Sequence, residues 1–272
     1  MLDLYQHDEP YYPSSDNEPM GENDVICWLM TTSLDTLKRH FQDDENVYVS
    51  SNSFVYYVKG EPKERVAPDL YVVKGVSSRQ RRNYKIFEEG VVPQVVFEFT
   101  TDSSRFKDLG TKKGLYELLG VKEYYVFDPA GEYLSPPFRA YLLVDGVFQE
   151  REPKSSYFSE ELDLTIKAVD KLLRFYPPDS LQAVPTSGEL KKLAQEQATR
   201  AAQEAARAEK EAARAEKEAA RAEKEAARAK KEAARAEKEA AKAKLESERA
   251  DREAARVAEL ERQLEALRRR GS

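Results

Sequence analysis

The chain has 272 residues and a formal net charge of −6 at neutral pH, but this charge is divided unevenly. Residues 189–272 contain 23 Lys/Arg and 19 Asp/Glu and so carry +4, which leaves −10 on residues 1–188. An acidic body is poorly suited to tight, non-specific binding of phosphate backbones. Any nucleic-acid role must therefore depend on local basic segments or on metal ions.

Several classes of protein are excluded by what the sequence lacks. Cys27 is the only cysteine, so there is no disulfide framework and no cysteine-based zinc site. Two histidines, His7 and His40, argue against a histidine-rich metal site. No run approaches the roughly 18 apolar residues of a membrane span, and the N-terminus MLDLYQHDEP lacks a secretory signal pattern. We therefore expect a soluble cytoplasmic protein with no membrane partner.

The first half of the chain alternates between helical and strand patterns. Residues 1–23 are polar and rich in proline, which predicts an irregular N-terminal arm. Apolar residues at helical spacing predict a helix over about 24–41. The segment VYVSSNSFVYYV (47–58) indicates a hairpin with its turn at Ser51–Asn52–Ser53. A further strand is expected over 67–76.

The basic segment SSRQRRNYK (77–85) leads into the second half of this region. We expect a strand over 95–100, a helix over about 105–119 and another strand over 121–129. The segment AYLLVDGVFQE (140–150) predicts a hairpin that turns at its Asp–Gly pair. Together these patterns predict a mixed α/β domain over residues 24–188.

From Glu189 onward the sequence predicts one long helical tail, residues 189–272. The unit AEKEAAR repeats from residue 208, and its alanines fit the a and d positions of a weak coiled coil. A stronger apolar seam in a different phase consists of Val257, Leu260, Leu264 and Leu267. Two interpretations remain open: self-association through the tail, or an isolated helix supported by pairs such as Arg207–Glu211.

Two carboxylates stand where apolar residues are expected. Glu98 interrupts the strand VVFEF, and Asp69 opens the strand APDLYVV. Burying an ionised carboxylate costs several kcal/mol or more unless its pKa shifts or a cation compensates it. Convergence of the two side chains would favour Mg²⁺, which takes oxygen ligands. Alternatively, Asp69 caps a turn and Glu98 pairs with a core Lys or Arg.

The helix after the Glu98 strand carries a lysine on its inward face. Lys112 shares this face with Leu109 and Tyr116, whereas Lys107 and Lys113 are expected to point into solvent. An inward Asp, Glu and Lys together indicate metal-assisted hydrolysis. The carboxylates would hold the ion, and the ammonium would stabilise developing negative charge or orient the attacking water.

These residues lie within motifs that match a known family. YYPSSDNEPMGEND, APDLYVV and VVFEFTTDSSRFKDLGTKKGLYELLGVKEYYVFDP occur in order. Over about residues 10–190 the sequence resembles the Uma-two family of putative restriction endonucleases, in the PD-(D/E)XK nuclease superfamily. The resemblance implies a restriction-endonuclease-like αβββαβ core with added β-strands, here followed by the long C-terminal helix. It also implies DNA endonuclease activity, with Mg²⁺ or Mn²⁺ between Asp69 and Glu98.

One position departs from the pattern of the wider superfamily. There the lysine lies two residues after the strand glutamate, a position that Thr100 occupies here. The resemblance to Uma-two proteins instead implies Lys112, on the following helix. A glutamate near the start of the first helix completes many such sites. Glu22 matches it best, with Glu18 and Asp24 as alternatives.

One basic cluster is available to contact DNA in the acidic body. It consists of Arg79, Arg81, Arg82 and Lys85. A solvated loop is the alternative interpretation, and Arg268–Arg270 offer a further non-specific contact or simply suit the helix dipole. A second function also remains open: a non-catalytic interaction protein that keeps the nuclease fold and recruits partners through its tail.

Overall fold

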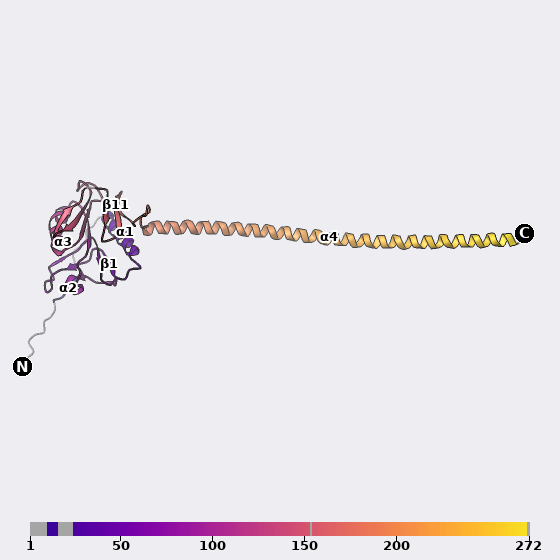
Figure 1. Ribbon diagram of the computed structural model, residues 1–272, viewed down its shortest axis with the longest axis horizontal. Helices are drawn as coiled ribbons and strands as arrows, with labels where there is room; N and C mark the ends of the chain where they lie inside the picture. The colour runs from indigo at the N-terminus through magenta and orange to yellow at the C-terminus, as the bar shows by residue number, and fades with distance from the viewer. Residues whose placement is uncertain (1–9, 16–23, 153, 271–272) are drawn as a thin grey trace, which may run out of the picture. The chain divides into compact units, whose positions relative to one another are not determined.

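The computed structural model describes residues 10–15, 24–152 and 154–270, with side chains described up to residue 264. The chain divides into two units, residues 1–194 and 195–272. Figure 1 shows the last helix as one continuous element. Residues 10–15 contain neither helix nor strand.

The described residues form a mixed α/β structure. The helices are α1 (Asp24–His40), α2 (Ile86–Glu89), the π-helix η1 (Lys107–Lys112), α3 (Lys113–Leu119) and α4 (Ser187–Arg270). The first strands are β1 (Val47–Ser50), β2 (Val55–Tyr56), β3 (Arg65–Val66), β4 (Leu70–Lys74), β5 (Tyr84–Lys85) and β6 (Val95–Phe99). The others are β7 (Glu123–Phe127), β8 (Phe138–Val144), β9 (Val147–Glu150), β10 (Ser156–Ser159), β11 (Leu164–Val169) and β12 (Leu172–Tyr176).

A six-stranded sheet positions the candidate site. Its strand order is β1-β4-β6-β7-β8-β9, and two three-stranded sheets, β10-β11-β12 and β3-β2-β5, accompany it. Strands β6 and β7 are parallel, whereas the other neighbours in the large sheet are antiparallel. Parallel strands need a crossover connection, which η1 and α3 provide here. The helical crossover therefore lies between β6 and β7 and follows a short turn after β6.

The two faces of β6 belong to different apolar clusters. Val95, Phe97 and Phe99 lie in a cluster that includes residues of α1. Val96 lies in the other cluster, which includes Tyr116 of α3. Because side chains alternate between the faces of a strand, Glu98 shares the face of Val96 and is directed toward the η1–α3 segment.

The hairpin predicted over residues 47–58 is wrong. Strand β1 pairs with β4, with Val47 opposite Lys74, whereas β2 pairs with β3 and β5 in a separate sheet. The chain does bend at Asn52, whose φ is 45°. Val55 and Tyr56 are both buried, and their strand partners are β3 and β5 rather than β1. A local alternation pattern identifies strands but does not choose between such partners.

The hairpin predicted within residues 140–150 is confirmed. Strands β8 and β9 pair antiparallel, with Val144 opposite Val147. Asp145 and Gly146 connect them with φ values of 51° and 82°. Two consecutive residues with positive φ are the requirement of the two-residue turn that Asp–Gly favours.

The helix α4 begins with a capping box. The backbone N–H of Thr186 donates to Oε2 of Glu189 at 2.8 Å, and the N–H of Glu189 donates to Oγ1 of Thr186 at 3.3 Å. Such reciprocal bonds satisfy donors that a helix start leaves without partners. Arg174 adds a bidentate contact to Glu189, with both N–O distances 2.9 Å.

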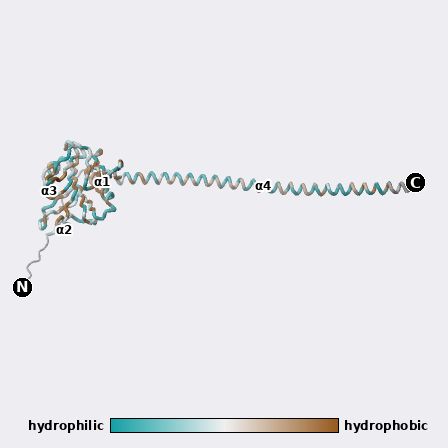
Figure 2. The backbone as a smooth tube through the Cα atoms, viewed as in Figure 1, coloured by the Kyte–Doolittle hydropathy of each residue, from teal (hydrophilic) through white to brown (hydrophobic). Residues whose placement is uncertain are grey.

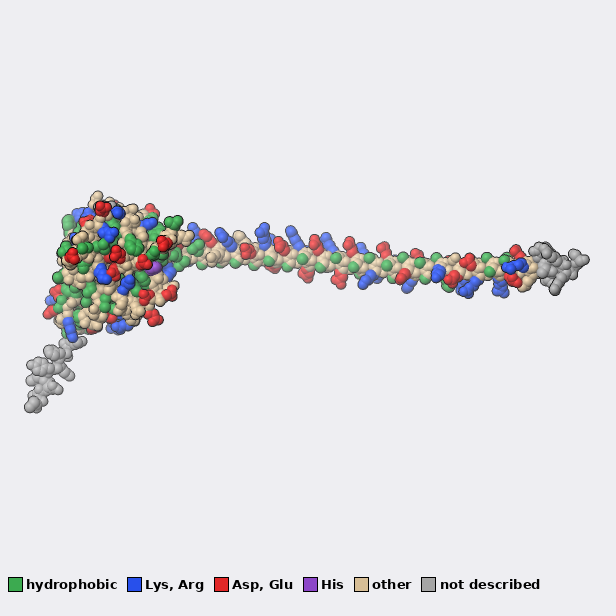
Figure 3. All heavy atoms as spheres, in the orientation of Figure 1, with side chains coloured by type: hydrophobic (Ala, Val, Ile, Leu, Met, Phe, Trp, Pro, Cys, Tyr) green, Lys and Arg blue, Asp and Glu red, His purple; other side chains and the backbone are tan. Residues whose placement is uncertain are grey.

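The described side chains of α4 beyond residue 194 are exposed. Figure 2 shows hydrophilic and weakly hydrophobic positions alternating along the helix, and Figure 3 shows acidic and basic side chains interspersed on it. Within the described part of the chain, no helix is long and apolar enough to cross a membrane.

Candidate active site

Glu98 is the centre of a polar cluster inside the acidic body. Its side chain is fully buried on β6. Its Oε2 accepts a hydrogen bond from Nζ of Lys112 at 2.8 Å, and its Oε1 accepts one from the hydroxyl of Tyr116 at 2.6 Å. Both carboxylate oxygens therefore have a donor, as a buried acid requires.

Asp69 lies at the entrance of the strand next to Glu98. The register of β4 and β6 pairs Leu70 with Phe97, so one step further along the strands Asp69 comes opposite Glu98. Side chains directly opposite each other on neighbouring strands are close enough to interact. Oδ2 of Asp69 accepts a hydrogen bond from the backbone N–H of Phe99 at 2.6 Å, which fixes the side chain at this edge.

Lys112 is the cation that faces these acids. Its Nζ lies 2.8 Å from Glu98 and 3.2 Å from Oδ1 of Asp108, and its side chain is 24% exposed. Burial lowers the pKa of Lys112, but attraction to Glu98, Asp108 and Asp69 outweighs burial and raises the pKa above its ordinary value. Lys112 is therefore a permanent cation at neutral pH, able to stabilise negative charge but not to accept a proton.

Burial dominates the electrostatics of the other groups in the cluster. Burial raises the pKa of Glu98, and Asp108 raises it further, although Lys112 and Tyr116 oppose both effects. Burial and the charge of Glu98 also hold the pKa of Tyr116 well above its ordinary value. The Tyr116 hydroxyl therefore keeps its proton and acts as a donor to Glu98.

Asp108 is a member of the cluster that the sequence analysis missed. Its side chain is buried, and its Oδ2 accepts a hydrogen bond from Oγ1 of Thr100 at 2.8 Å. Thr100 is the residue at the position of the lysine in the wider superfamily. Asp108 precedes Lys112 by four residues, and this spacing of opposite charges on a helix was the available signal.

The turn that carries Asp108 and Lys112 is a π-helix rather than the α-helix predicted over 105–119. It covers Lys107–Lys112 and is followed by regular α-helix in α3. The prediction that Lys112 shares a face with Tyr116 depends only on the α-helical spacing after the π-turn, and both side chains reach Glu98. π-turns are rare and occur frequently at functional sites.

The two neighbouring lysines differ from each other. Lys107 is exposed, as predicted. Lys113 was also expected to point into solvent, but it is only half-exposed, and its Nζ lies 4.5 Å from the ring centroid of Tyr141. The ring of Tyr141 is a favourable neighbour for a cation, so Lys113 covers the sheet instead of extending away from it.

The donor set of Asp69 and Glu98 fits a small divalent cation. Mg²⁺ takes hard oxygen ligands, needs only one or two carboxylates and keeps several waters. Each carboxylate oxygen has two lone-pair sites, so the donors from Lys112 and Tyr116 leave Glu98 with further acceptor capacity. Among the described residues, no group of three or more His, Cys, Asp or Glu side chains could hold a metal ion.

The sequence offers three candidates for the acidic residue near the first helix. Two of them, Glu22 and Glu18, fall outside the described residues. Their alternative, Asp24, is the first residue of α1 and is exposed. Its position suits the positive end of the helix dipole.

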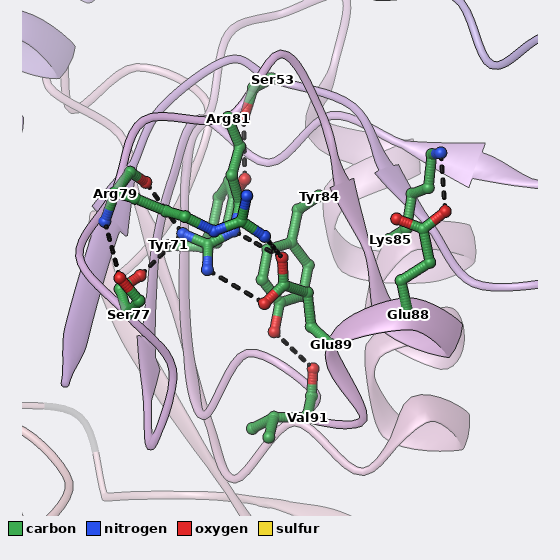
Figure 4. Close-up of polar contacts among 10 residues, drawn as sticks. All are labelled: Ser53, Tyr71, Ser77, Arg79, Arg81, Tyr84, Lys85, Glu88, Glu89 and Val91. Atoms are coloured by element: carbon green, nitrogen blue, oxygen red, sulfur yellow. Dashed lines mark hydrogen bonds and ion pairs between the residues drawn. The ribbon is translucent and has the colours of Figure 1, made fainter.

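The basic cluster is organised by two glutamates of α2 (Figure 4). Arg81 makes a bidentate contact to Glu89, at 2.7 and 3.0 Å, and its side chain is only 4% exposed. Its guanidinium also lies 4.4 Å from the ring centroid of Tyr48. Arg81 therefore holds the loop to the body. Lys85, which is half-buried, pairs with Glu88 at 2.8 Å.

The outer members of the basic cluster are open to solvent. Arg79 shares Glu89 at 3.0 Å, but its side chain is 66% exposed. Arg82 is also exposed. Within the predicted cluster, these two arginines present their charge outward, whereas Arg81 does not.

The fold and the cluster together define a mixed α/β protein whose central parallel strand pair carries a buried carboxylate beside an acid and a lysine. The profile of the Uma2 family, described as "putative restriction endonuclease", matches residues 17–167, more than half of the chain. The chain belongs to this family, and the resemblance seen in the sequence is confirmed.

One solved structure similar to this chain is a putative nuclease belonging to DUF820 from Anabaena variabilis ATCC 29413. The two are 10% identical with a TM-score of 0.39, over 53% of this chain and 76% of that one. No curated protein matches the sequence.

Proposed function

We propose that the protein is a divalent-metal-dependent endonuclease that hydrolyses phosphodiester bonds in DNA, with Mg²⁺ or Mn²⁺ as its metal. The observation that carries the proposal is the position of Glu98: buried on the central strand, opposite Asp69, and in contact with the partly exposed Lys112. Membership of the Uma2 family supports the same reaction class.

Each residue of the cluster has a chemical role in this proposal. Asp69 and Glu98 would hold the metal, which when bound supplies a Lewis acid that stabilises charge on the phosphoryl group. Lys112 would place its ammonium against a phosphate oxygen or the attacking water. Tyr116 fixes the orientation of Glu98 through its hydrogen bond of 2.6 Å.

The order of elements in the large sheet supports a restriction-endonuclease-like αβββαβ core. Helix α1 precedes β1, β4 and β6, which occupy consecutive places in the sheet, and α3 leads to β7 beside β6. Strands β8 and β9 would then be additions at one edge.

DNA would be contacted mainly by Arg79 and Arg82. Their side chains are exposed, and they belong to the basic segment of an otherwise acidic body. Arg81 would act indirectly by holding this loop, and Lys85 would contribute less because it pairs with Glu88. Few phosphate contacts imply a shallow dependence of affinity on salt.

We also propose that residues 189–272 assemble copies of the chain through the apolar seam near the end of α4. Val257, Leu260 and Leu264 are 52–54% exposed and would be covered by a second copy. The alanine repeat is less suited to self-pairing, because Glu209 and Glu211 flank its seam at the e and g positions. Identical copies would bring these like charges together.

The test of the nuclease proposal is nicking of supercoiled plasmid by the full-length protein with Mg²⁺ or Mn²⁺. We expect cleavage by the wild type and its loss in Asp69→Ala and Lys112→Ala. Lys107→Ala, which removes an exposed lysine from the same turn, is the matched control and should cleave normally. Equal background from every variant, with normal circular dichroism, would contradict the proposal.

A second candidate is a non-catalytic interaction protein that retains the nuclease fold and recruits partners through α4. One observation favours it: Lys112 and Tyr116 each donate to one oxygen of Glu98, so part of the acceptor capacity that a metal would use is taken. Calorimetric titration with Mn²⁺ separates the candidates. Binding that disappears in Asp69→Ala favours the nuclease, whereas a wild type that binds no metal favours the interaction protein.

A further inference from the structure

We propose that Asp108 is a positioning residue that holds the Lys112 ammonium against Glu98, and that Thr100 keeps Asp108 in place. The catalytic consequence of this inference rests on the proposed nuclease function, but the positioning itself does not. Neither Asp108 nor Thr100 belongs to the Asp–Glu–Lys set that the sequence motifs indicate.

The two oxygens of Asp108 face different partners. Oδ2 accepts the hydrogen bond from Thr100 at 2.8 Å, within the buried interior. Oδ1 is buried and has no hydrogen-bond partner of regular geometry, but it lies 3.2 Å from Nζ of Lys112. A carboxylate that is 1% exposed needs a nearby cation, and Lys112 is the cation in contact with it.

The backbone around Asp108 is also fixed from the sheet. The hydroxyl of Tyr124 on β7 donates to the main-chain carbonyl of Asp108 at 2.9 Å. The backbone N–H of Thr100 donates to the carbonyl of Phe127 at 2.8 Å. Both members of the Thr100–Asp108 pair are therefore anchored to β7, so their hydrogen bond defines where the carboxylate lies.

Asp108 and Glu98 together fix the orientation of the Lys112 ammonium. An ammonium has three donor hydrogens. Glu98 accepts a hydrogen bond from Nζ at 2.8 Å, and the Asp108 carboxylate attracts Nζ from 3.2 Å in a second direction. The ammonium keeps donor capacity for a phosphate oxygen or a water, and the lysine side chain is 24% exposed. Without Asp108, the flexible lysine chain would be held by Glu98 alone.

The first test does not depend on activity. Lysine ammonium groups that are held and shielded exchange their protons slowly and give resolved signals in ¹H–¹⁵N NMR spectra. We expect such a signal for Lys112, assigned by its absence in Lys112→Ala. It should be lost or broadened in Asp108→Asn, which keeps the size of the side chain, and in Thr100→Val, which removes the hydroxyl. Thr100→Ser, which keeps the hydroxyl, should restore it.

The second test is the kinetics of plasmid nicking by the same variants. We expect Asp108→Asn to lower kcat about 10–100-fold with little change in KM, as for other residues that orient a catalytic group. Thr100→Ser should recover most of the loss seen in Thr100→Val. The control is Asp102→Asn, because Asp102 is an exposed acid of the same segment whose nearest cation is Arg105 at 3.6 Å.

The outcomes distinguish the two proposals. A Lys112 signal that persists unchanged in Asp108→Asn and Thr100→Val overturns the positioning role. If Asp108→Asn does not fold, Thr100→Val and its serine rescue decide the question. If the wild type does not cleave DNA, the nuclease proposal fails, while the NMR comparison still decides whether Asp108 holds Lys112.

Discussion

Nζ of Lys112 lies 2.8 Å from Oε2 of Glu98, although the two residues are 14 positions apart and belong to a π-helix and a central strand. The contact ties the crossover helix to the sheet. It also leaves the lysine partly exposed at the candidate site. One interaction therefore serves both the stability of the fold and the proposed chemistry.

Removal of the Lys112 charge should destabilise the protein more than removal of any exposed lysine. In Lys112→Met, Glu98 and Asp108 stay buried without their cation. We expect a loss of about 3 kcal/mol in the free energy of unfolding, the lower end of the range for breaking a buried ion pair, because the lysine is partly exposed. Urea denaturation measures this. Lys107→Met is the control, and equal stability of the two variants would contradict the prediction.

The buried Glu123 should make stability fall as the pH rises from the acid range. Burial raises its pKa, although the Ser159 hydroxyl and the Glu161 backbone N–H, at 3.1 Å, partly oppose this. A raised folded-state pKa means that the folded protein binds more protons than the unfolded chain. The contribution of Glu123 is therefore greatest below its unfolded pKa and is lost as pH rises through the folded pKa.

Glu123→Gln isolates this effect, because glutamine keeps an acceptor oxygen and does not titrate. The variant should gain stability relative to the wild type as the pH rises above about 4.5, by about 1.4 kcal/mol for each unit of pKa difference between the folded and unfolded states. Thermal or urea unfolding at several pH values from about 4 to about 8 measures the difference in stability between the variant and the wild type. A difference that does not change with pH would show that Glu123 titrates normally.

The basic segment should separate into structural and DNA-binding residues. Arg81→Met removes the bidentate contact to Glu89 and should cost about 2 kcal/mol of stability, as for lost hydrogen bonds to a charged group. The hydrogen bonds from Arg81 also lower the pKa of Glu89. The stability that this pair contributes should therefore be present above the unfolded pKa of Glu89 and be lost as pH falls through its folded value.

Arg79→Ala and Arg82→Ala should instead leave stability nearly unchanged and weaken DNA binding. Each substitution should reduce the slope of log affinity against log salt by about 1 if the residue contacts a phosphate. Fluorescence anisotropy at several salt concentrations measures the DNA affinity and its salt dependence. Ca²⁺ replaces Mg²⁺ in this experiment so that the DNA is not cleaved. Unchanged affinity in the double variant would place the DNA contact elsewhere.

Assembly through α4 should depend on its leucines and not on its alanines. Leu260→Glu with Leu264→Glu should convert the oligomer to a monomer in sedimentation analysis, since both side chains are more than half exposed on the single helix. The matched pair Ala219→Gln and Ala222→Gln, on the alanine seam, should leave the oligomer intact. Loss of assembly in the alanine pair alone would reverse the assignment.

The contact between Glu98 and Lys112 could be anticipated because each residue violates a local pattern. A glutamate within VVFEF has no solvated face to occupy, and Lys112 precedes the inward Tyr116 by one helical turn. Physical reasoning about buried charge then required a partner for each. The position of Asp69 opposite Glu98 follows from strand pairing.

Other features were beyond local reasoning. Asp108 lies among charged residues and resembles part of a solvated helix face, yet it is buried because Thr100 and Lys112 surround it. Likewise, the pairing of β1 with β4 joins segments that are distant in the chain. Interactions of this kind depend on tertiary packing and cannot be predicted from a short segment of the sequence.

The π-turn makes the candidate site sensitive to chain length at one point. A Cβ at Gly110, in the middle of η1, would have no heavy atom of another segment within 4 Å, so an alanine has room there. Deletion of this residue would instead allow the wide turn to relax into an α-helix, and the residues before it would rotate by roughly 100° relative to the residues after it. Asp108 and Lys112 would remain neighbours three residues apart, but Asp108 could not stay on Thr100 while Lys112 stays on Glu98. Loss of a single codon could thus improve the helix and disrupt the site, whereas an alanine at the same position would leave the site intact.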